Sequence, residues 1–412
     1  MRIKINKSIA NGTIKAQPSK SYSHRLLIAG ALSAKSNNCE WVVENIVLSN
    51  DVVATINCLN ALGIEVEIIQ DKAYIKNSNN ELKNELVFNC GESGSTLRFF
   101  IPIALLTGKK LIFKGTEKLI SRGIGPYEDI FKKQGINIKI YKDEIRIEGK
   151  LKAGVFNLPG NISSQFITGL LFALPLVNGN SQINLLSNLE SKNYVDMTID
   201  VLKKSNIDIE LIDSEYAKSY KIIGGKAYNG GQGLREFIVE GDYSNAAFID
   251  AFNYIGGNVF ITGLNYKSYQ GDKVYKELFE KLESENQIID ISNCIDLGPI
   301  LFCMASLKNG AHFINTSRLK IKESDRVLDL ASELKKFNVE VIDLGNEVII
   351  NNKHINRPIE NLYGHNDHRI VMALSVMLSV YGGVLDGIEA VNKSYPSFFD
   401  DIKMLGIEVL YE

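Results

Sequence analysis

The pattern of apolar and polar residues repeats along the chain as an amphipathic helix followed by two alternating strands. In each copy the helix runs into a Gly or Asn, residues that readily adopt the left-handed conformation that ends helices. A strand with every second residue apolar follows, then a polar turn and a second such strand, which predict a hairpin with one buried face. The copies lie at 59–76, 130–148, 201–223, 334–350 and 402–410. A weaker copy without the Gly combines a helix at 278–283 with a strand at 287–291.

Six copies at intervals of roughly 70 residues predict six similar α/β units, naturally divided as three in each of two domains. A boundary between the halves is expected near 224–242, in a glycine-rich segment that contains Gly225, Gly230, Gly231 and Gly233. The strand expected at 3–5 is detached from a full unit and is predicted to pair in the C-terminal half. The predicted domains are residues 15–238, and residues 1–14 joined with 239–412, so the chain crosses between them twice.

Six further helices share a second pattern, a polar start followed by an almost entirely apolar body. Their starts lie at 18–25, 92–98, 163–165, 242–245, 296–299 and 366–369. A helix that is apolar on all sides is buried. If the repeats are related by symmetry, the N-termini in each domain point to one place and form an anion site. Good capping residues explain each start singly, but not the Arg and Lys that accompany several of them.

The first of these starts is unusually basic. Ser19 can cap the helix, while Lys20, His24 and Arg25 crowd its first turns and Ser21 shares a face with Arg25. The helix macrodipole disfavours cations at this end, so an anionic ligand would account for them. Taken alone, a solvated basic turn is the simpler interpretation.

Composition narrows the class of protein. The chain has 412 residues, 45% hydrophobic and 23% charged, which is ordinary for a globular protein of two domains. A net charge of -2 gives no global field for nucleic acid or an anionic membrane, so we expect neither as a partner. The longest apolar runs, 166–177 and 370–381, are too short to span a bilayer, and residues 1–8 lack a signal-type apolar region. Five cysteines without metal spacing fit a reducing compartment: Cys39, Cys58, Cys90, Cys294 and Cys303.

A second dense cluster of charges lies at 318–326. Lys322, Glu323 and Arg326 are spaced to share one face at the start of a helix expected at 327–337. An ordinary surface network of ion pairs is the alternative. Other charged residues also have simple alternatives: Asp296 as a helix N-cap, His368 and Arg369 as a capping segment, and Lys393 as a solvated loop lysine. The turn at 121–126 is neither a dinucleotide-binding nor a P-loop motif, and no HExxH, GxSxG or EF-hand pattern is present.

Ten short motifs then occur in order across residues 18–396: PSKSYSHR, GESGSTLR, SRGIGP, SSQF, SKNYVD, GDYSNA, IDLGP, IKESDR, NDHR and NKSYP. In this order the set resembles the 5-enolpyruvylshikimate-3-phosphate synthase family, also called 3-phosphoshikimate 1-carboxyvinyltransferase. The resemblance implies an α/β (α+β) fold of two inside-out α/β barrels, each with three βαβαββ-like units, and helix N-termini facing the interdomain cleft. It implies transfer of the enolpyruvyl group of phosphoenolpyruvate to the 5-hydroxyl of shikimate 3-phosphate. It also implies no cofactor, no metal and a cytoplasmic monomer of the shikimate pathway.

Roles carry over from the resemblance motif by motif. The phosphoenolpyruvate site would comprise Lys20, Gly94, Arg122, Gln165, Arg326, Arg369 and Lys393. The shikimate 3-phosphate site would comprise Lys20, Ser21, Arg25, Ser163, Ser164, Gln165, Ser191, Tyr194, Asp296 and Lys322. The catalytic residues would be Asp296, Glu323 and Lys20.

The chemistry is consistent with these roles. Two highly anionic substrates need several Arg and Lys side chains in one place. C3 of phosphoenolpyruvate must gain a proton while the attacking hydroxyl loses one, which requires a general acid and a general base. Our hypothesis is that Asp296 takes the hydroxyl proton, Glu323 handles the C3 proton and Lys20 assists the departing phosphate; the first two roles could be exchanged.

Three positions depart from the family pattern. Glu92 stands where many relatives have Asn, and we assign it no binding role because a Glu would repel the phosphoenolpyruvate carboxylate. Arg318 stands where relatives often have a substrate-contacting Asn, and the usual Gly before the first Ser-Lys is absent, since the sequence there reads Gln17-Pro18-Ser19.

Other functions fit the sequence less well. The sister transferase acting on UDP-N-acetylglucosamine would carry Lys-Asn in place of Lys20-Ser21, and a cysteine-bearing loop near Arg122. A non-catalytic anion-binding protein would be expected to lack Asp296 or Glu323. A nucleic-acid binder would need a basic surplus.

Overall fold

The computed structural model describes residues 1–37, 40–78, 80–213, 218–228, 235–351 and 354–412. These residues form two compact units, one made of 18–240 and the other of 1–17 with 241–412. The boundaries predicted from the sequence lie after residues 14 and 238, three and two residues before the boundaries of these units. Gly230, Gly231, Gly233 and Cys39, named in the sequence-based predictions, lie outside the described residues.

The 18–240 unit contains three four-stranded sheets with one topology. In each sheet a first strand lies parallel to the second, and a hairpin adds the other two strands antiparallel. The sheets have the orders β6(Glu85–Asn89)-β7(Lys110–Lys114)-β9(Glu144–Glu148)-β8(Asn137–Ile140), β10(Val155–Leu158)-β11(Ser181–Leu185)-β13(Lys218–Ile222)-β12(Ile209–Asp213) and β14(Arg235–Ile238)-β3(Trp41–Glu44)-β5(Lys72–Asn77)-β4(Ile64–Ile69). The last sheet joins the two ends of the unit, because β14 comes from its C-terminal end and pairs with β3.

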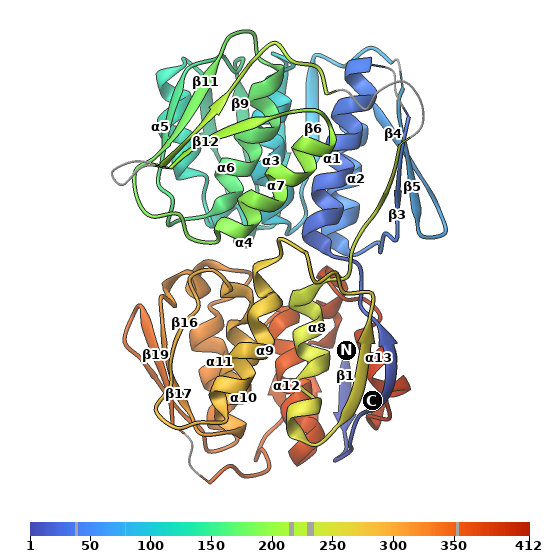
Figure 1. Ribbon diagram of the computed structural model, residues 1–412, viewed down its shortest axis with the longest axis vertical. Helices are drawn as coiled ribbons and strands as arrows, with labels where there is room; N and C mark the ends of the chain where they lie inside the picture. Colours follow the sequence, from blue (N-terminus) through green and yellow to red (C-terminus); the bar gives the residue numbers. More distant parts are fainter. Residues whose placement is uncertain (38–39, 79, 214–217, 229–234, 352–353) are drawn as a thin grey trace. The chain divides into compact units, whose positions relative to one another are not determined.

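Two kinds of helix accompany these sheets. The apolar helices α1(Lys20–Asn37), α3(Gly94–Leu105) and α6(Ser164–Ala173) form the centre of the unit, and most of their residues are buried. The amphipathic helices α2(Asn50–Ala61), α5(Gly125–Lys133) and α7(Lys192–Lys204) precede the hairpins and bury one face. Short helices α4(Glu117–Ser121) and η1(Leu174–Leu176) complete the unit. Figure 1 shows α3, α6 and α7 side by side within it.

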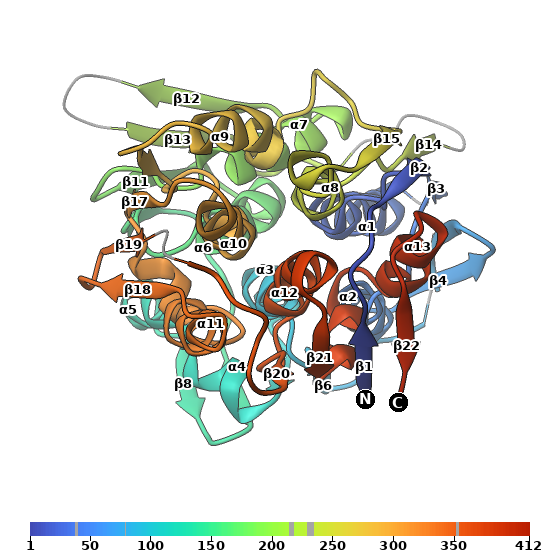
Figure 2. The same ribbon diagram turned by 90° about the horizontal axis from the view of Figure 1, so that it is seen from below.

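The other unit repeats the same plan with one reduced sheet. Two sheets have four strands, β16(Ile288–Asp290)-β17(Ala311–Ile314)-β19(Glu347–Asn351)-β18(Glu340–Asp343) and β20(Leu362–Tyr363)-β21(Gly383–Asp386)-β1(Arg2–Ile5)-β22(Val409–Tyr411). The third consists of β15(Asn258–Thr262) parallel to β2(Asn11–Lys15). As predicted, the first strand pairs with C-terminal strands, so that both chain ends lie on neighbouring strands (Figure 2).

The helices of this unit are again of two kinds. The apolar ones, α8(Tyr243–Asp250), α10(Gly298–Leu307) and α12(His368–Tyr381), are almost wholly buried. The amphipathic ones are α9(Tyr275–Leu282), α11(Arg326–Lys335) and α13(Phe398–Met404). Five 3₁₀ helices connect the elements: η2(Asn253–Ile255), η3(Gly271–Val274), η4(Ile295–Leu297), η5(Ser317–Ile321) and η6(Ile388–Lys393). Among the described residues, no helix has the length and apolar character needed to cross a membrane.

The weaker sequence repeat does not fold as expected. Its strand, β16, does not form a hairpin after α9 but lies parallel to β17 and begins the next sheet. The repeat lacks the Gly that ends the other helices and the polar turn that would reverse the chain. Among the described residues of this unit, the third sheet has two strands, β15 and β2, where the other sheets have four.

Candidate active site

In the 18–240 unit, side chains from the N-terminal halves of four helices meet. His24 Nδ1 in α1 lies 2.7 Å from Thr55 Oγ1 in α2, and Thr55 Oγ1 lies 2.8 Å from Thr96 Oγ1 in α3. Gln165 Nε2 in α6 donates to Ser95 Oγ in α3 at 2.9 Å. Several helix N-termini therefore share one end of the unit, which favours the binding of anions there.

The side chain of Arg25 joins α1 to the start of α7. It donates from Nε to Thr198 Oγ1 at 2.9 Å, from Nη1 to the Ser21 carbonyl at 2.8 Å and from Nη2 to the Tyr194 carbonyl at 2.9 Å. Its guanidinium also lies 5.3 Å from the centre of the Phe99 ring. Burial lowers the pKa of Arg25 to about 10, so it remains charged at pH 7. Because Arg25 is only 3% exposed, the alternative of a solvated basic turn is wrong for it.

The neighbouring His24 is neutral. Burial, helped by the charges of Lys20 and Arg25, holds the pKa of His24 well below its usual 6.5. The amide of Tyr22 donates to Ser19 Oγ at 3.4 Å, which agrees with the expected cap of this helix. The positive charges in the first turns of α1 are therefore those of Lys20 and Arg25.

Lys20 has a partner that the sequence did not reveal. Its Nζ lies 2.8 Å from Asp51 Oδ2, and the two side chains are only 15% and 12% exposed. Asp51 lies in the first turn of α2, where an acidic residue stabilises the helix. The one signal in the sequence is an acidic residue two positions after a capping serine, Ser49.

Arg122 lies against the first residue of α3. A Cβ on Gly94 would lie 3.0 Å from Arg122 Nη2 and 3.1 Å from Nη1. Arg98, another residue without a sequence-based role, is 7% exposed and donates to Gln165 Oε1 at 2.7 Å. It also donates to the carbonyl of Arg122 at 3.3 Å. Arg98 thus fixes both Gln165 and the backbone that carries Arg122.

Replacing Gly94 by Ala is expected to displace the Arg122 guanidinium and weaken binding of its anionic ligand. A contact of 3.0–3.2 Å requires the guanidinium to move, because the Cβ lies in the first turn of a buried helix. We expect the KM for this anionic ligand to rise about tenfold, because the guanidinium must shift by a few tenths of an ångström and a misplacement of about 1 Å can cost about a hundredfold. Steady-state kinetics with each substrate varied in turn would measure it. Gly125→Ala is the control for loss of a nearby glycine, since Gly125 is the first residue of α5, does not have a left-handed φ, and a Cβ there meets nothing within 4 Å; equal KM values for both variants would contradict the expectation.

The other unit has a cluster built around Arg326, which is 1% exposed. Its Nη1 lies 2.9 Å from Asp296 Oδ1, its Nη2 2.8 Å from Glu323 Oε2 and its Nε 2.7 Å from Asp367 Oδ2. Burial works against the charged guanidinium, but the three carboxylates outweigh it and raise the pKa of Arg326 above its usual range. The alternative of a surface network of ion pairs is therefore wrong.

Asp296 lies among three cations. Besides Arg326, its Oδ1 lies 3.3 Å from Lys322 Nζ and its Oδ2 3.5 Å from Arg369 Nη2. Arg369 Nη1 also donates to the Asp296 carbonyl at 3.1 Å. Helix α10 has no side-chain N-cap, so the capping alternative for Asp296 is wrong. A different helix of this cluster, α12, does have a side-chain cap: Asp367 accepts a hydrogen bond from the Arg369 amide at 2.9 Å.

Lys322 and Lys393 complete this cluster. Burial, together with the neighbouring charges of Arg326 and Arg318, lowers the pKa of Lys322 to about 8 although Asp296 and Glu323 oppose the shift. Lys393 is 7% exposed and its Nζ donates to the Asn366 carbonyl. The alternative of a solvated loop lysine is therefore wrong for Lys393.

The helical face expected for Lys322, Glu323 and Arg326 does not form. Helix α11 begins at Arg326 and is capped by Asp325, which accepts from the amides of Val327 and Leu328. Lys322 and Glu323 precede the helix, with Lys322 in extended backbone. They still reach Asp296 and Arg326 because the chain turns between η5 and α11.

The predicted site residues therefore form two groups, one in each unit. The group of the 18–240 unit consists of Lys20, Ser21, Arg25, Gly94, Arg122, Ser163, Ser164, Gln165, Ser191 and Tyr194. Ser163 caps α6 and accepts from the Gln165 amide at 3.3 Å, and Ser191 precedes α7 with a left-handed φ of 54°. The group of the other unit consists of Asp296, Lys322, Glu323, Arg326, Arg369 and Lys393.

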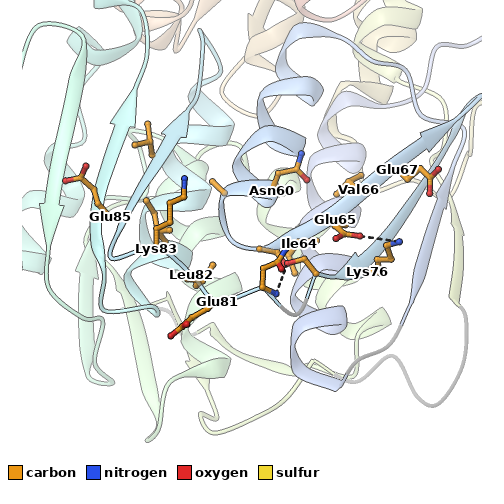
Figure 3. A pocket seen from close by; sticks show the side chains of 16 residues that line it. Asn60, Ile64, Glu65, Val66, Glu67, Lys76, Glu81, Leu82, Lys83 and Glu85 are labelled. Atoms are coloured by element: carbon orange, nitrogen blue, oxygen red, sulfur yellow. Dashed lines mark hydrogen bonds and ion pairs between the residues drawn. The ribbon is translucent and has the colours of Figure 1, made fainter.

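A hollow elsewhere in the 18–240 unit has a different character. It has a volume of about 740 Å³ and lies along β4, β5 and the start of β6 (Figure 3). Its lining includes the ion pair of Glu65 and Lys76 at 3.2 Å, three further glutamates and one further lysine, but none of the predicted site residues. An acidic lining does not suit phosphorylated substrates.

Each of the two α/β units, taken by itself, gathers helix N-termini and basic side chains. Solved structures share this fold: EPSP synthase from Acinetobacter baumannii has a TM-score of 0.77 at 20% identity and full coverage of both chains. The enolpyruvyl transferase NikO from Streptomyces tendae has a TM-score of 0.76 at 12% identity, covering 99% of this chain and 98% of that one.

Sequence comparison is more specific. The family described as EPSP synthase (3-phosphoshikimate 1-carboxyvinyltransferase) matches residues 5–402. The 3-phosphoshikimate 1-carboxyvinyltransferase of Clostridium acetobutylicum is 40% identical over 99% of this chain and 98% of its own length. That of Clostridium kluyveri is 38% identical with the same coverage. The chain belongs to the EPSP synthase family of transferases, which confirms the fold, the family and the enzyme class expected from its sequence.

Proposed function

We propose that this chain transfers the enolpyruvyl group of phosphoenolpyruvate to the 5-hydroxyl of shikimate 3-phosphate and releases phosphate. The observation that carries the proposal is the pair of clusters described above, each basic and each at the N-termini of buried helices. Family membership supports the same reaction. We further propose that both clusters serve one active site in the cleft between the two domains, and that the protein acts as a cytoplasmic monomer.

The two substrates would be held by different residues. Arg25, Ser21, Ser163, Ser164, Ser191, Tyr194 and Lys322 would bind shikimate 3-phosphate. Arg122, Arg326, Arg369, Lys393 and the Gly94 amide would bind phosphoenolpyruvate, with Lys20 and Gln165 reaching both. In support, the first set supplies hydroxyls and a buried guanidinium for a phosphorylated sugar-like ring, and the second supplies several cations for a compact phosphate and carboxylate.

The reaction would proceed by addition and elimination. As the 5-hydroxyl attacks C2 of phosphoenolpyruvate, Asp296 would take its proton and Glu323 would deliver a proton to C3. Loss of a C3 proton and of phosphate, assisted by Lys20, would then give the product. Asp296 and Glu323 each contact a different nitrogen of Arg326, whose positive charge offsets the repulsion between the two carboxylates.

The two charged departures take no part in this scheme as catalytic groups. Glu92 follows the left-handed Gly91 and is partly exposed, before the cap of α3. Arg318 is 7% exposed and donates to the Ser292 carbonyl, beside Lys322. We propose that the positive charge of Arg318 makes binding of a substrate phosphate nearby more favourable, and that its side chain does not contact the ring of shikimate 3-phosphate.

The proposal is tested by phosphate release from phosphoenolpyruvate with shikimate 3-phosphate as acceptor, run beside UDP-N-acetylglucosamine. Rapid release with the first acceptor and none with the second is expected. Release only with UDP-N-acetylglucosamine would favour the sister transferase, and release with neither would favour a binding protein.

The charge of Lys322 predicts how activity depends on pH. With a pKa of about 8, Lys322 loses its proton as the pH rises, so kcat/KM for shikimate 3-phosphate should fall above pH 8. Lys322→Arg should move this fall to higher pH, because an Arg stays charged. The pKa in the folded protein lies below its usual 10.5, so this group makes the fold more stable, not less, as the pH rises between these values. If kcat/KM for shikimate 3-phosphate fell at the same pH in the wild type and in Lys322→Arg, Lys322 would not be the group responsible for the fall.

A further inference from the structure

The turn that leads into α12 has an uncommon backbone conformation. His365 and Asn366 are consecutive residues other than glycine with left-handed φ values of 49° and 52°. Asn and His adopt this region more often than most residues, but two in succession persist only where surrounding contacts hold them. Nothing in the reaction scheme above uses His365, so its contacts call for an explanation.

His365 lies between two carboxylates of α11. Its Nε2 is 2.9 Å from Glu333 Oε1 and its Nδ1 is 3.3 Å from Asp329 Oδ1. Carboxylates accept hydrogen bonds, and each of the two faces one nitrogen of the imidazole ring. Burial works against the charge of Glu333, but the bonds from His365, Lys336 and the Tyr363 amide outweigh it and lower the pKa of Glu333.

Glu333 also anchors the chain just before the turn. It is 2% exposed, and its Oε2 accepts from the Tyr363 amide at 2.9 Å and from Lys336 Nζ at 2.8 Å. The Gly364 amide donates to the Asp386 carbonyl at 2.9 Å, and the Tyr363 and His365 rings lie edge to face at 5.1 Å. The left-handed residues are thus fixed from one side by α11 and from the other by β21.

The far side of the turn holds two residues assigned to phosphoenolpyruvate. The Asn366 carbonyl accepts from Lys393 Nζ, and the Asp367 carboxylate accepts from Arg326 Nε at 2.7 Å. The Asp367 amide in turn donates to the Gly364 carbonyl at 2.8 Å. A rotation of the backbone at His365 would therefore move both the carbonyl that holds Lys393 and the carboxylate that holds Arg326.

We propose that His365 is a positioning residue for phosphoenolpyruvate binding: clamped between Asp329 and Glu333, it fixes the 364–367 turn that places Lys393 and Arg326. The inference rests on the proposed function for the identity of the ligand. His365 touches no reacting atom in this scheme and acts only through the turn.

The experiment compares His365→Gly with the wild-type enzyme. Gly keeps the left-handed backbone accessible and removes both carboxylate contacts, so we expect the KM for phosphoenolpyruvate to rise about tenfold. The KM for shikimate 3-phosphate should stay near the wild-type value. His365→Asn should lie between them, since Asn tolerates this conformation and can donate one hydrogen bond.

Further variants separate positioning from a general structural role. Asp329→Asn removes the charge of one contact and should raise the same KM by less, and combining it with His365→Gly should add little, because both act through one contact. His312→Ala is the matched control: His312 also pairs with a carboxylate, Glu347 at 2.7 Å, on strands of the same unit. It should leave both KM values unchanged.

A second measurement needs no activity. Amide hydrogen exchange at Gly364 and Asp367 should quicken in His365→Gly and remain unchanged in His312→Ala. Unchanged exchange, or KM values for the two substrates that rise equally, would overturn the inference. An inactive wild-type enzyme would contradict the proposed function instead, and the exchange result would still decide the role of His365.

Discussion

Asp296→Asn and Glu323→Gln are each expected to lower kcat by about a hundredfold to ten-thousandfold, the usual contribution of a general acid or base. Both replacements preserve the size of the side chain and remove its capacity to exchange a proton. Asp296 should show the larger effect, because it also contacts Lys322, Arg326 and Arg369. Initial rates of phosphate release at saturating concentrations of both substrates would measure the loss.

A matched control lies in the same unit. Asp343 pairs with Lys320 at 2.6 Å, but its side chain is 39% exposed and it has no role in the proposed site. Asp343→Asn should therefore retain the wild-type rate. If either Asp296→Asn or Glu323→Gln also turned over near that rate, the corresponding acid–base role would be abandoned.

Arg326→Ala is expected to destabilise its unit by about 3–5 kcal/mol, the range for breaking a buried ion pair by removing one partner. The replacement would leave the carboxylates of Asp296, Glu323 and Asp367 without the cation that now lies between them. Since Asp367 is fully buried, water cannot readily replace the lost partner. Activity should be lost as well, because Lys393 and Arg369 belong to the same cluster.

Urea unfolding can assign this effect to one unit. The single tryptophan, Trp41, lies in the 18–240 unit, so its fluorescence reports on that unit alone, whereas far-ultraviolet circular dichroism reports on both. The dichroism transition of Arg326→Ala should shift to lower urea while the Trp41 transition stays in place. Arg146→Ala is the control, since the side chain of Arg146 is 53% exposed where it pairs with Glu144, so its loss should matter by less than about 1 kcal/mol. Equal stabilities of the two variants would contradict a structural role for the Arg326 cluster.

The periodicity of apolar residues predicted much of the architecture, because hairpins and helices form between residues that are close in the sequence. The hairpins at 64–77, 137–148 and 340–351 follow from alternation over a few positions, and the buried helices α3 and α12 follow from almost entirely apolar runs. The prediction of a sixth helix–hairpin unit at the weaker repeat was wrong because strand pairing there is not a local property. Alternation near 287–291 indicated a strand, but its pairing with β17 depends on a segment more than twenty residues away.

The candidate site likewise has residues that the sequence indicated and contacts that it did not. The ten motifs indicated most of its residues, but Asp51, Arg98 and Asp367 had no sequence-based role. Their partners are 31, 67 and 41 positions away in the chain, at Lys20, Gln165 and Arg326. No local pattern indicates a contact that arises only when separate helices pack side by side.

The sequence by itself determined the repeated helix–hairpin units, the buried helices with polar starts and the family, because each depends on the order and type of residues along the chain. Tertiary structure decided which charges are buried and paired. Lys393 and Arg326 carry the same charge in any fold, but only packing removed them from water and placed them beside the Asn366 carbonyl and three carboxylates. Burial and distance set the strength of a charge, and both arise from contacts between residues far apart in the sequence.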